Sequence, residues 1–236
     1  YYDKDPLQRT RIVHALAAID ADMFGLVEVG GGKKVIDSLV AALNRAKGGN
    51  EYTYLPWQGH EAVSDYTLIS STGRRKWSPT TNISSSTTWG PGTASSYRLS
   101  GNGNMETVSS SASIISRPNR APARGRTPTV ATGRAFSTTS ACRRLKDRLS
   151  SLKFYYNTDN VLIMGDLNAL YLEDPIRVLT DAGYRNQTNR FGDDYSYCFD
   201  GQVQYLDYSL ASAELEEFVT GAVVWHINSD EPSFLD

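Results

Sequence analysis

Cysteine is scarce in this chain, and so are long apolar runs. Cys142 and Cys198 are the only cysteines among 236 residues, so one bridge at most can form and no disulfide framework is indicated. Cys198 stands between Tyr197 and Phe199, which favours a buried free thiol. No run approaches the roughly 18 apolar residues of a membrane span, and the sequence therefore predicts none.

An excess of charge of one sign is also missing. The formal net charge is -2, which gives no overall attraction to a nucleic acid. Any binding of phosphate must therefore come from local features or from a metal ion. With 236 residues, of which 40% are hydrophobic, the chain can bury the core of one α/β domain or of an incomplete larger one.

The spacing of apolar residues predicts helices between strands. One helix is expected to begin at Pro6, and a second spans residues 36 to 43 and ends at Gly48-Gly49. A third is expected near residue 174, with Asp174 as its N-cap and Gly183 after its end. Because helices alternate with strand-like runs in both halves of the chain, the sequence predicts a layered α/β fold with covered sheet faces.

The most informative motif follows the apolar run Val161-Leu162-Ile163-Met164, where Gly165-Asp166-Leu167-Asn168 stands. A short apolar strand that ends in small polar residues delivers reactive side chains to the edge of an α/β sheet. Asp166 can bind a hard divalent cation, and the Asn168 amide can donate to a phosphate oxygen. Taken alone, the same four residues also fit an ordinary polar turn. Three further acids lie in or after strand-like runs, at Glu28, Asp207 and Asp230.

These motifs resemble, in order, those of the endonuclease/exonuclease/phosphatase superfamily, to which deoxyribonuclease I belongs. The resemblance is carried by Leu26-Val27-Glu28-Val29, Gly165-Asp166-Leu167-Asn168, Leu206-Asp207-Tyr208 and Ser229-Asp230-Glu231-Pro232. The segments Glu173-Asp174-Pro175-Ile176, Tyr195-Ser196-Tyr197 with Phe199-Asp200-Gly201-Gln202, and Trp225-His226-Ile227-Asn228 are closer still to the bacterial extracellular nuclease branch. The similarity covers residues 7 to 57 and 151 to 236.

The resemblance implies a sandwich of two sheets flanked by helices, as in deoxyribonuclease I, and a site for Mg²⁺ or Mn²⁺. It assigns Glu28 as the main metal ligand and Asp230 as a second carboxylate near the metal. It assigns Asp166 to orient or deprotonate the attacking water, and Asn168 to donate to the phosphate. We expect these residues to converge in one polar cleft, with Glu28 no more than about 12 Å from Asp166.

The catalytic histidine of the superfamily is missing from its usual place. In the wider superfamily a histidine directly follows the last aspartate and is oriented by the aspartate of the Leu-Asp motif. Here Glu231 follows Asp230, although Asp207 is present, and His226 is the nearest histidine that can substitute. A histidine beside Trp225 also fits a packed, hydrogen-bonded role, so both interpretations of His226 stay open.

The middle of the chain, at about residues 58 to 150, departs from the family pattern. From 71 to 140, Ser and Thr supply 15 and 12 of 70 residues, and Glu106 is the only acid beside eight arginines. Such a composition predicts a loop-like, poorly ordered and protease-sensitive segment. Three explanations stay open, namely an inserted flexible loop, a basic arm that binds polyanions, and an out-of-frame coding segment. The expected histidine-bearing motif is replaced by Gly133-Arg134-Ala135-Phe136.

The sequence therefore predicts a single endonuclease/exonuclease/phosphatase-like domain over residues 1 to 236, in an incomplete form. Its predicted function is divalent-metal-dependent hydrolysis of phosphodiesters in DNA or RNA, as an extracellular-type nuclease. The alternatives are another phosphoesterase of the same fold, acting on sugar phosphates, inositol phosphates or sphingomyelin, and an inactive remnant that binds nucleic acid. Secretion is expected from the resemblance alone, because Tyr1-Tyr2-Asp3-Lys4-Asp5 is not a signal peptide. The chain is also expected to lack the first catalytic Asn strand and part of the last strand, and its oligomeric state is left open.

Overall fold

A computed structural model describes residues 6–29, 32–54, 65–71, 78–79, 93–100, 106–113, 129–192, 195–199 and 202–226. The chain divides into two compact units. The N-terminal unit comprises residues 1–86 and 97–107, and the C-terminal unit comprises residues 87–96 and 108–236. Each unit contains helices and paired strands of its own. No helix in the described ranges is long and apolar enough to cross a membrane.

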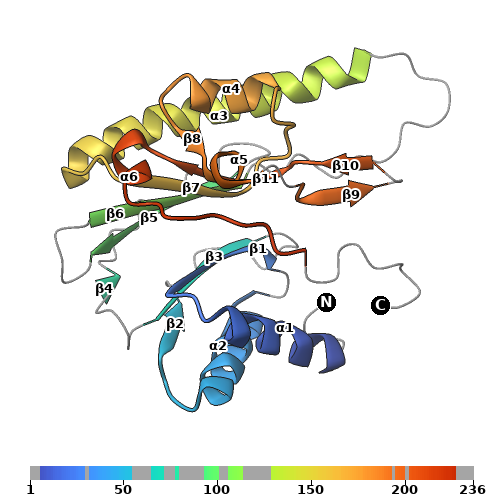
Figure 1. Cartoon of the computed structure of the whole chain (residues 1–236), viewed down its shortest axis with the longest axis vertical. Helices are drawn as coiled ribbons and strands as arrows, with labels where there is room; N and C mark the ends of the chain where they lie inside the picture. The colour runs from blue at the N-terminus through green and yellow to red at the C-terminus, as the bar shows by residue number, and fades with distance from the viewer. Residues whose placement is uncertain are drawn as a thin grey trace. The chain divides into compact units, whose positions relative to one another are not determined.

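The N-terminal unit packs two helices against a small antiparallel sheet (Figure 1). Its core is formed by residues of both helices and by Phe24 and Tyr52 of the sheet. The helices expected after Pro6 and around residues 36 to 43 are confirmed, and the second ends at Lys47, directly before Gly48, whose φ of 77° suits glycine. The elements are α1 (Pro6–Ile19), β1 (Met23–Val29), α2 (Gly32–Lys47), β2 (Tyr52–Tyr54) and β3 (Asp65–Ser71), with strand order β1-β3-β2, and β4 (Ser78–Pro79) pairs with β5 (Thr93–Ser100).

The C-terminal unit is built on the strand order β6-β7-β11-β8. Strand β7 is parallel to β6 and antiparallel to β11, and the short hairpin β9-β10 lies outside this order. In Figure 1, α3 and α4 lie together over this sheet. The elements are β6 (Glu106–Ser113), α3 (Thr129–Tyr156), β7 (Val161–Asp166), α4 (Asp174–Thr180), β8 (Arg185–Asn186), α5 (Gln187–Phe191), β9 (Tyr197–Phe199), β10 (Gln202–Gln204), β11 (Asp207–Ala211) and α6 (Ala213–Glu216).

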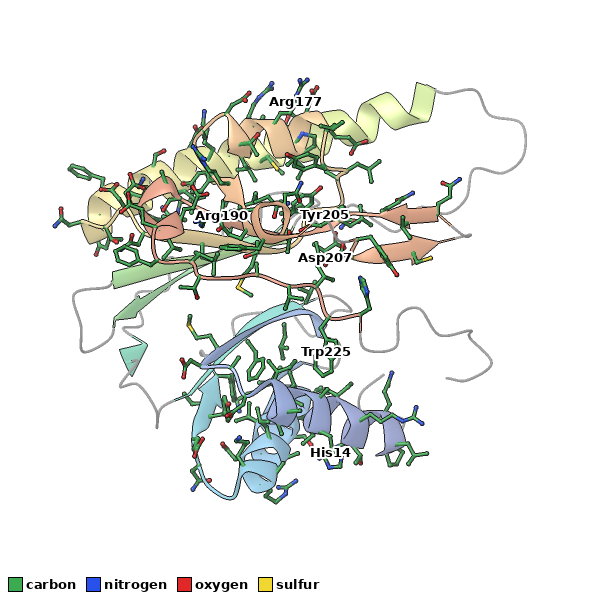
Figure 2. The ribbon with its side chains drawn as sticks, in the orientation of Figure 1. His14, Arg177, Arg190, Tyr205, Asp207 and Trp225 are labelled. Atoms are coloured by element: carbon green, nitrogen blue, oxygen red, sulfur yellow. The ribbon has the colours of Figure 1, made fainter. Side chains whose placement is uncertain are left out.

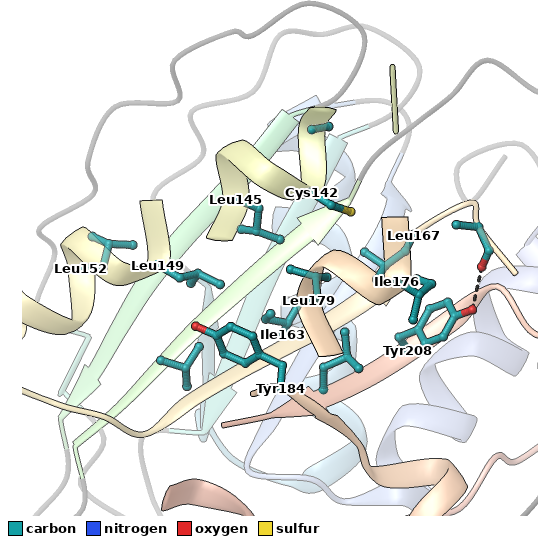
Figure 3. Close-up of a cluster of buried hydrophobic side chains, with 14 residues drawn as sticks. Cys142, Leu145, Leu149, Leu152, Ile163, Leu167, Ile176, Leu179, Tyr184 and Tyr208 are labelled. Carbon is teal, nitrogen blue, oxygen red and sulfur yellow. Dashed lines mark hydrogen bonds between the residues drawn. The ribbon is translucent and has the colours of Figure 1, made fainter. Parts of the chain in front are cut away.

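A continuous apolar core joins α3 and α4 to the strands β7 and β11 (Figure 3). Leu149, Ile163, Ile176 and Leu179 are all fully buried in it. Burial of such side chains stabilises the fold by about 1.5 to 3 kcal/mol each. This core supports β7 from one side, so the residues at the end of β7 are carried by a rigid strand.

Two details of the sequence-based expectation are corrected. Glu173 occupies the N-cap position of α4 without a side-chain capping hydrogen bond, and Asp174, expected as the cap, lies inside the first helical turn. An acid in that position still interacts favourably with the helix dipole. Both cysteines are free, but Cys198 is exposed, whereas Cys142 is buried. Burial in the α3 core raises the pKa of Cys142 to about 12, so this thiol is unreactive near neutral pH.

The Ser/Thr-rich tract is also more structured than its composition suggests. Strands β5 and β6 and the first part of α3 fall within residues 71 to 140, where loops were expected. The reason lies in the neighbouring strand, because β6 pairs with β7 from Val108↔Val161 to Ser110↔Ile163. Backbone hydrogen bonds to β7, and the apolar core behind β7, thus stabilise this strand, whereas its Ser and Thr side chains offer little apolar surface. The remaining residues of the tract lie outside the described residues, and protease sensitivity stays a prediction.

Replacing Ser212 with Ala should lower the free energy of unfolding by about 2 kcal/mol. The buried Ser212 Oγ accepts from the Val161 backbone N–H at 3.0 Å and donates to Asp159 O at 2.7 Å. Alanine leaves both backbone groups without this partner. Urea denaturation measures the change. As a control, Ser151→Ala removes an exposed hydroxyl that donates only within α3, to Asp147 O, and should change stability by less than about 0.5 kcal/mol.

Candidate active site

Two aspartates are paired at one end of the C-terminal unit's sheet. Strand β7 ends at Asp166 and β11 begins at Asp207, and these two residues are directly opposite in the antiparallel ladder. The Leu167 N–H donates to Leu206 O at 3.0 Å and continues the pairing by one residue. Directly opposed residues project to the same face of a sheet, with Cβ atoms about 5 Å apart. The structure therefore brings together two site residues that are distant in sequence.

The residues after Asp166 form a tight polar turn. The Asp166 Oδ1 atom accepts from the Asn168 backbone N–H at 2.7 Å, and Asn168 has a φ of 48°. Asparagine tolerates this left-handed conformation better than most residues. The ordinary turn that the sequence also suggested is thus present. It does not compete with a functional role, because the turn itself sets the positions of Asp166 and Asn168 relative to each other.

Two contacts hold the loop that follows the turn. The buried Tyr208 hydroxyl donates to Ala169 O at 2.6 Å, which is the dashed contact in Figure 3. Burial raises the pKa of Tyr208, so the phenol stays protonated and remains a donor. On the other side, the Glu173 carboxylate accepts from the Leu170 N–H at 2.9 Å. The polar turn is therefore fixed both to β11 and to the start of α4.

Asp207 is supported by a serine that our interpretation of the sequence did not single out. The Ser196 Oγ accepts from the backbone N–H groups of Leu206 and Asp207, both at 3.0 Å. Partial burial raises the pKa of the Asp207 carboxyl, and a hydrogen bond with the Ser196 side chain opposes that rise. Figure 2 labels Asp207 near the β9-β10 hairpin, beside Tyr205. Ser196 belongs to the segment Tyr195-Ser196-Tyr197, which carries part of the family resemblance. That resemblance is the sequence signal by which Ser196 could have been found.

His226 is held by the residue next to Ser196. Its Nε2 atom lies 2.7 Å from Tyr195 O, and its ring stacks on the Tyr195 ring with centroids 4.2 Å apart and an interplanar angle of 16°. The neighbouring Trp225 is 55% exposed. His226 is thus packed and hydrogen-bonded, as one of the two interpretations expected. His226 contacts Tyr195, which is next to Ser196, and Ser196 in turn contacts the Asp207 backbone. A catalytic role for His226 stays a prediction.

The sequence of this chain is similar to that of a known protein family. Residues 1–230 match the model of the endonuclease/exonuclease/phosphatase family. The chain belongs to this family. Its members are hydrolytic phosphoesterases that generally use divalent metals. A search of curated proteins finds no match for the sequence.

Solved structures of this family share the fold at low sequence identity. The human Nocturnin catalytic domain is 16% identical, with a TM-score of 0.58, and the match covers 87% of this chain and 74% of that one. Truncated TDP2 from Caenorhabditis elegans is 12% identical, with a TM-score of 0.56 and coverages of 87% and 77%. A mannosyl-6-phosphatase from Bacteroides thetaiotaomicron is 13% identical, with a TM-score of 0.56 and coverages of 86% and 75%. The predicted deoxyribonuclease I-like α/β fold, a two-sheet sandwich flanked by helices, is confirmed.

Glu28, the family's expected metal ligand, lies at the end of β1 in the N-terminal unit. Between the pairs Leu26↔Thr67 and Val29↔Asp65, β1 contains one residue more than β3, and Glu28 lies within this bulge. Bulges are common beside active sites, because they redirect a side chain. The Glu28 side chain and Asp230 both lie outside the described residues, so their convergence with Asp166 stays a prediction.

The donor chemistry at the end of β7 fits a hard divalent cation. The carboxylates of Asp166 and Asp207 are oxygen donors of the kind that a hard divalent cation binds. Within the described ranges, no group of three or more His, Cys, Asp or Glu side chains forms a complete metal site. Among the described residues of the C-terminal unit, Asp166 is one that we expect to contribute, and the motif resemblance adds Glu28 and Asp230.

Proposed function

We propose that this protein is a nuclease that hydrolyses phosphodiester bonds of DNA or RNA with the help of Mg²⁺ or Mn²⁺. The observation that carries the proposal is the pair Asp166 and Asp207, opposed at the ends of β7 and β11, with Asn168 on the adjoining turn. The family supplies phosphoester hydrolysis, and the motifs shared with the extracellular nuclease branch favour a diester substrate. Extracellular action, and the working of residues 1–236 as one domain, rest on that motif resemblance.

Each residue has a role that follows from its chemistry. The Asp166 carboxylate orients a water molecule and accepts its proton as the water oxygen attacks phosphorus. The Asn168 amide donates to a phosphate oxygen while negative charge develops on it. The bond from phosphorus to the leaving oxygen then breaks, and the leaving oxygen takes up a proton. A bound divalent cation would supply charge neutralisation at the phosphate and a lower pKa for the attacking water.

A panel of phosphoesters tests the proposal. We expect turnover of DNA, RNA and bis(p-nitrophenyl) phosphate, and at least tenfold slower turnover of p-nitrophenyl phosphate, a monoester. Sugar phosphates, inositol phosphates and sphingomyelin complete the panel. Preference for a monoester would instead support a phosphatase, as the similarity to the mannosyl-6-phosphatase allows. Binding of DNA without cleavage under any metal condition would identify an inactive remnant.

A further inference from the structure

Ser196 is hydrogen-bonded to the segment that enters β11. Its hydroxyl oxygen accepts two backbone N–H groups, from Leu206 and from Asp207, both at 3.0 Å. Its own backbone N–H donates to Gln204 O at 3.1 Å. One small side chain, 11 residues away in sequence, thus holds the backbone at the start of β11.

Tyr195, the residue before Ser196, holds His226 in place. Because a carbonyl oxygen can only accept, the contact of 2.7 Å to Tyr195 O requires that His226 carry a proton on Nε2. In the neutral ring the lone pair is then on Nδ1, which is the atom that can accept a proton. Stacking on the Tyr195 ring fixes the plane of the imidazole. The orientation and the tautomer of His226 are therefore both set by Tyr195.

We propose that the dipeptide Tyr195-Ser196 is a positioning element that holds His226 and Asp207 in one constellation for the reaction. The inference rests on the proposed function. Its basis is that two adjacent residues contact the two groups. Ser196 accepts from the Asp207 backbone N–H, and Tyr195 contacts the His226 ring through its carbonyl oxygen and its own ring.

Amide hydrogen exchange tests the positioning without reference to activity. In Ser196→Ala the backbone N–H groups of Leu206 and Asp207 lose their acceptor, and their exchange should become about tenfold faster. In Ser196→Thr, which keeps the hydroxyl, exchange should stay within about threefold of wild type. Ser151→Ala, which removes an exposed hydroxyl on α3, is the matched control. Unchanged exchange at both amides in Ser196→Ala would overturn the proposal.

Steady-state kinetics test whether the positioning serves the reaction. Ser196→Ala should lower kcat by about 10-fold to 100-fold with little change in KM, and Ser196→Thr should restore it. In an Asp207→Asn background, Ser196→Ala should lower kcat by less than about twofold, because Ser196 acts through Asp207. An equal loss in both backgrounds would contradict the proposal, and so would a loss that follows thermal stability alone.

Variants of Tyr195 and His226 test whether Tyr195 positions the histidine ring. Tyr195→Phe keeps the stacked ring and the backbone carbonyl, and we expect its kcat within about threefold of wild type. Tyr195→Ala should lower kcat about as much as His226→Ala does. His226→Ala should leave thermal stability unchanged. If Tyr195→Ala leaves kcat intact while His226→Ala lowers it, Tyr195 does not position the ring. If the wild-type protein cleaves no phosphodiester, the proposed function is wrong and the kinetic predictions for these variants fail with it. Hydrogen exchange would still decide whether Ser196 holds the Asp207 backbone.

Discussion

Asp166→Asn should reduce phosphodiester turnover by about 10³-fold while it leaves the melting temperature nearly unchanged. The amide has the volume of the carboxylate, and its oxygen can still accept from the Asn168 N–H, which the Asp166 Oδ1 atom does at 2.7 Å. Asparagine therefore preserves the polar turn. It removes the charge that orients the attacking water, accepts its proton and supports the metal. Turnover of bis(p-nitrophenyl) phosphate together with a thermal melt measures both effects.

Asp166→Ala provides the contrast. Alanine removes the charge and also the acceptor for the Asn168 N–H, so this variant should lose about 1 kcal/mol of stability in addition to activity. Asn168, with its φ of 48°, depends on that contact for its place. Substantial turnover by Asp166→Asn would show that Asp166 is only a turn residue, and the proposed site would then be wrong.

Chelation of divalent cations should abolish turnover, and Mg²⁺ or Mn²⁺ added in excess should restore it. The physical reason is that the proposed reaction activates water with carboxylates, an amide and an imidazole, and has no activated Ser or Cys nucleophile. The measurement is cleavage of plasmid DNA in EDTA, followed by titration with each metal. Thermal melts in the same buffers separate loss of metal from loss of fold. Turnover that persists in excess EDTA would reject the metal-dependent mechanism.

Local patterns in the sequence were sufficient for the elements and for the family. Pro6, the apolar spacing from residue 36 to 43, and Gly48 predict helices that the structure contains, because helix formation depends on contacts three and four residues apart. The order of the motifs around Glu28, Asp166 and Asp207 indicates the family, and the match over residues 1–230 confirms it. These features are readable because each lies within a few consecutive residues.

Tertiary structure alone decided how the functional groups meet. The register that sets Asp166 opposite Asp207 depends on the pairing of strands about 40 residues apart, and Ser196 reaches Asp207 only because the β9-β10 hairpin returns the chain to β11. The same reason explains β6, since a Ser-rich segment becomes a strand when β7 offers it a hydrogen-bonding edge. Contacts between distant segments leave no periodic trace in the sequence. The chain itself therefore determined which chemistry is available, and the fold determined which residues hold it in place.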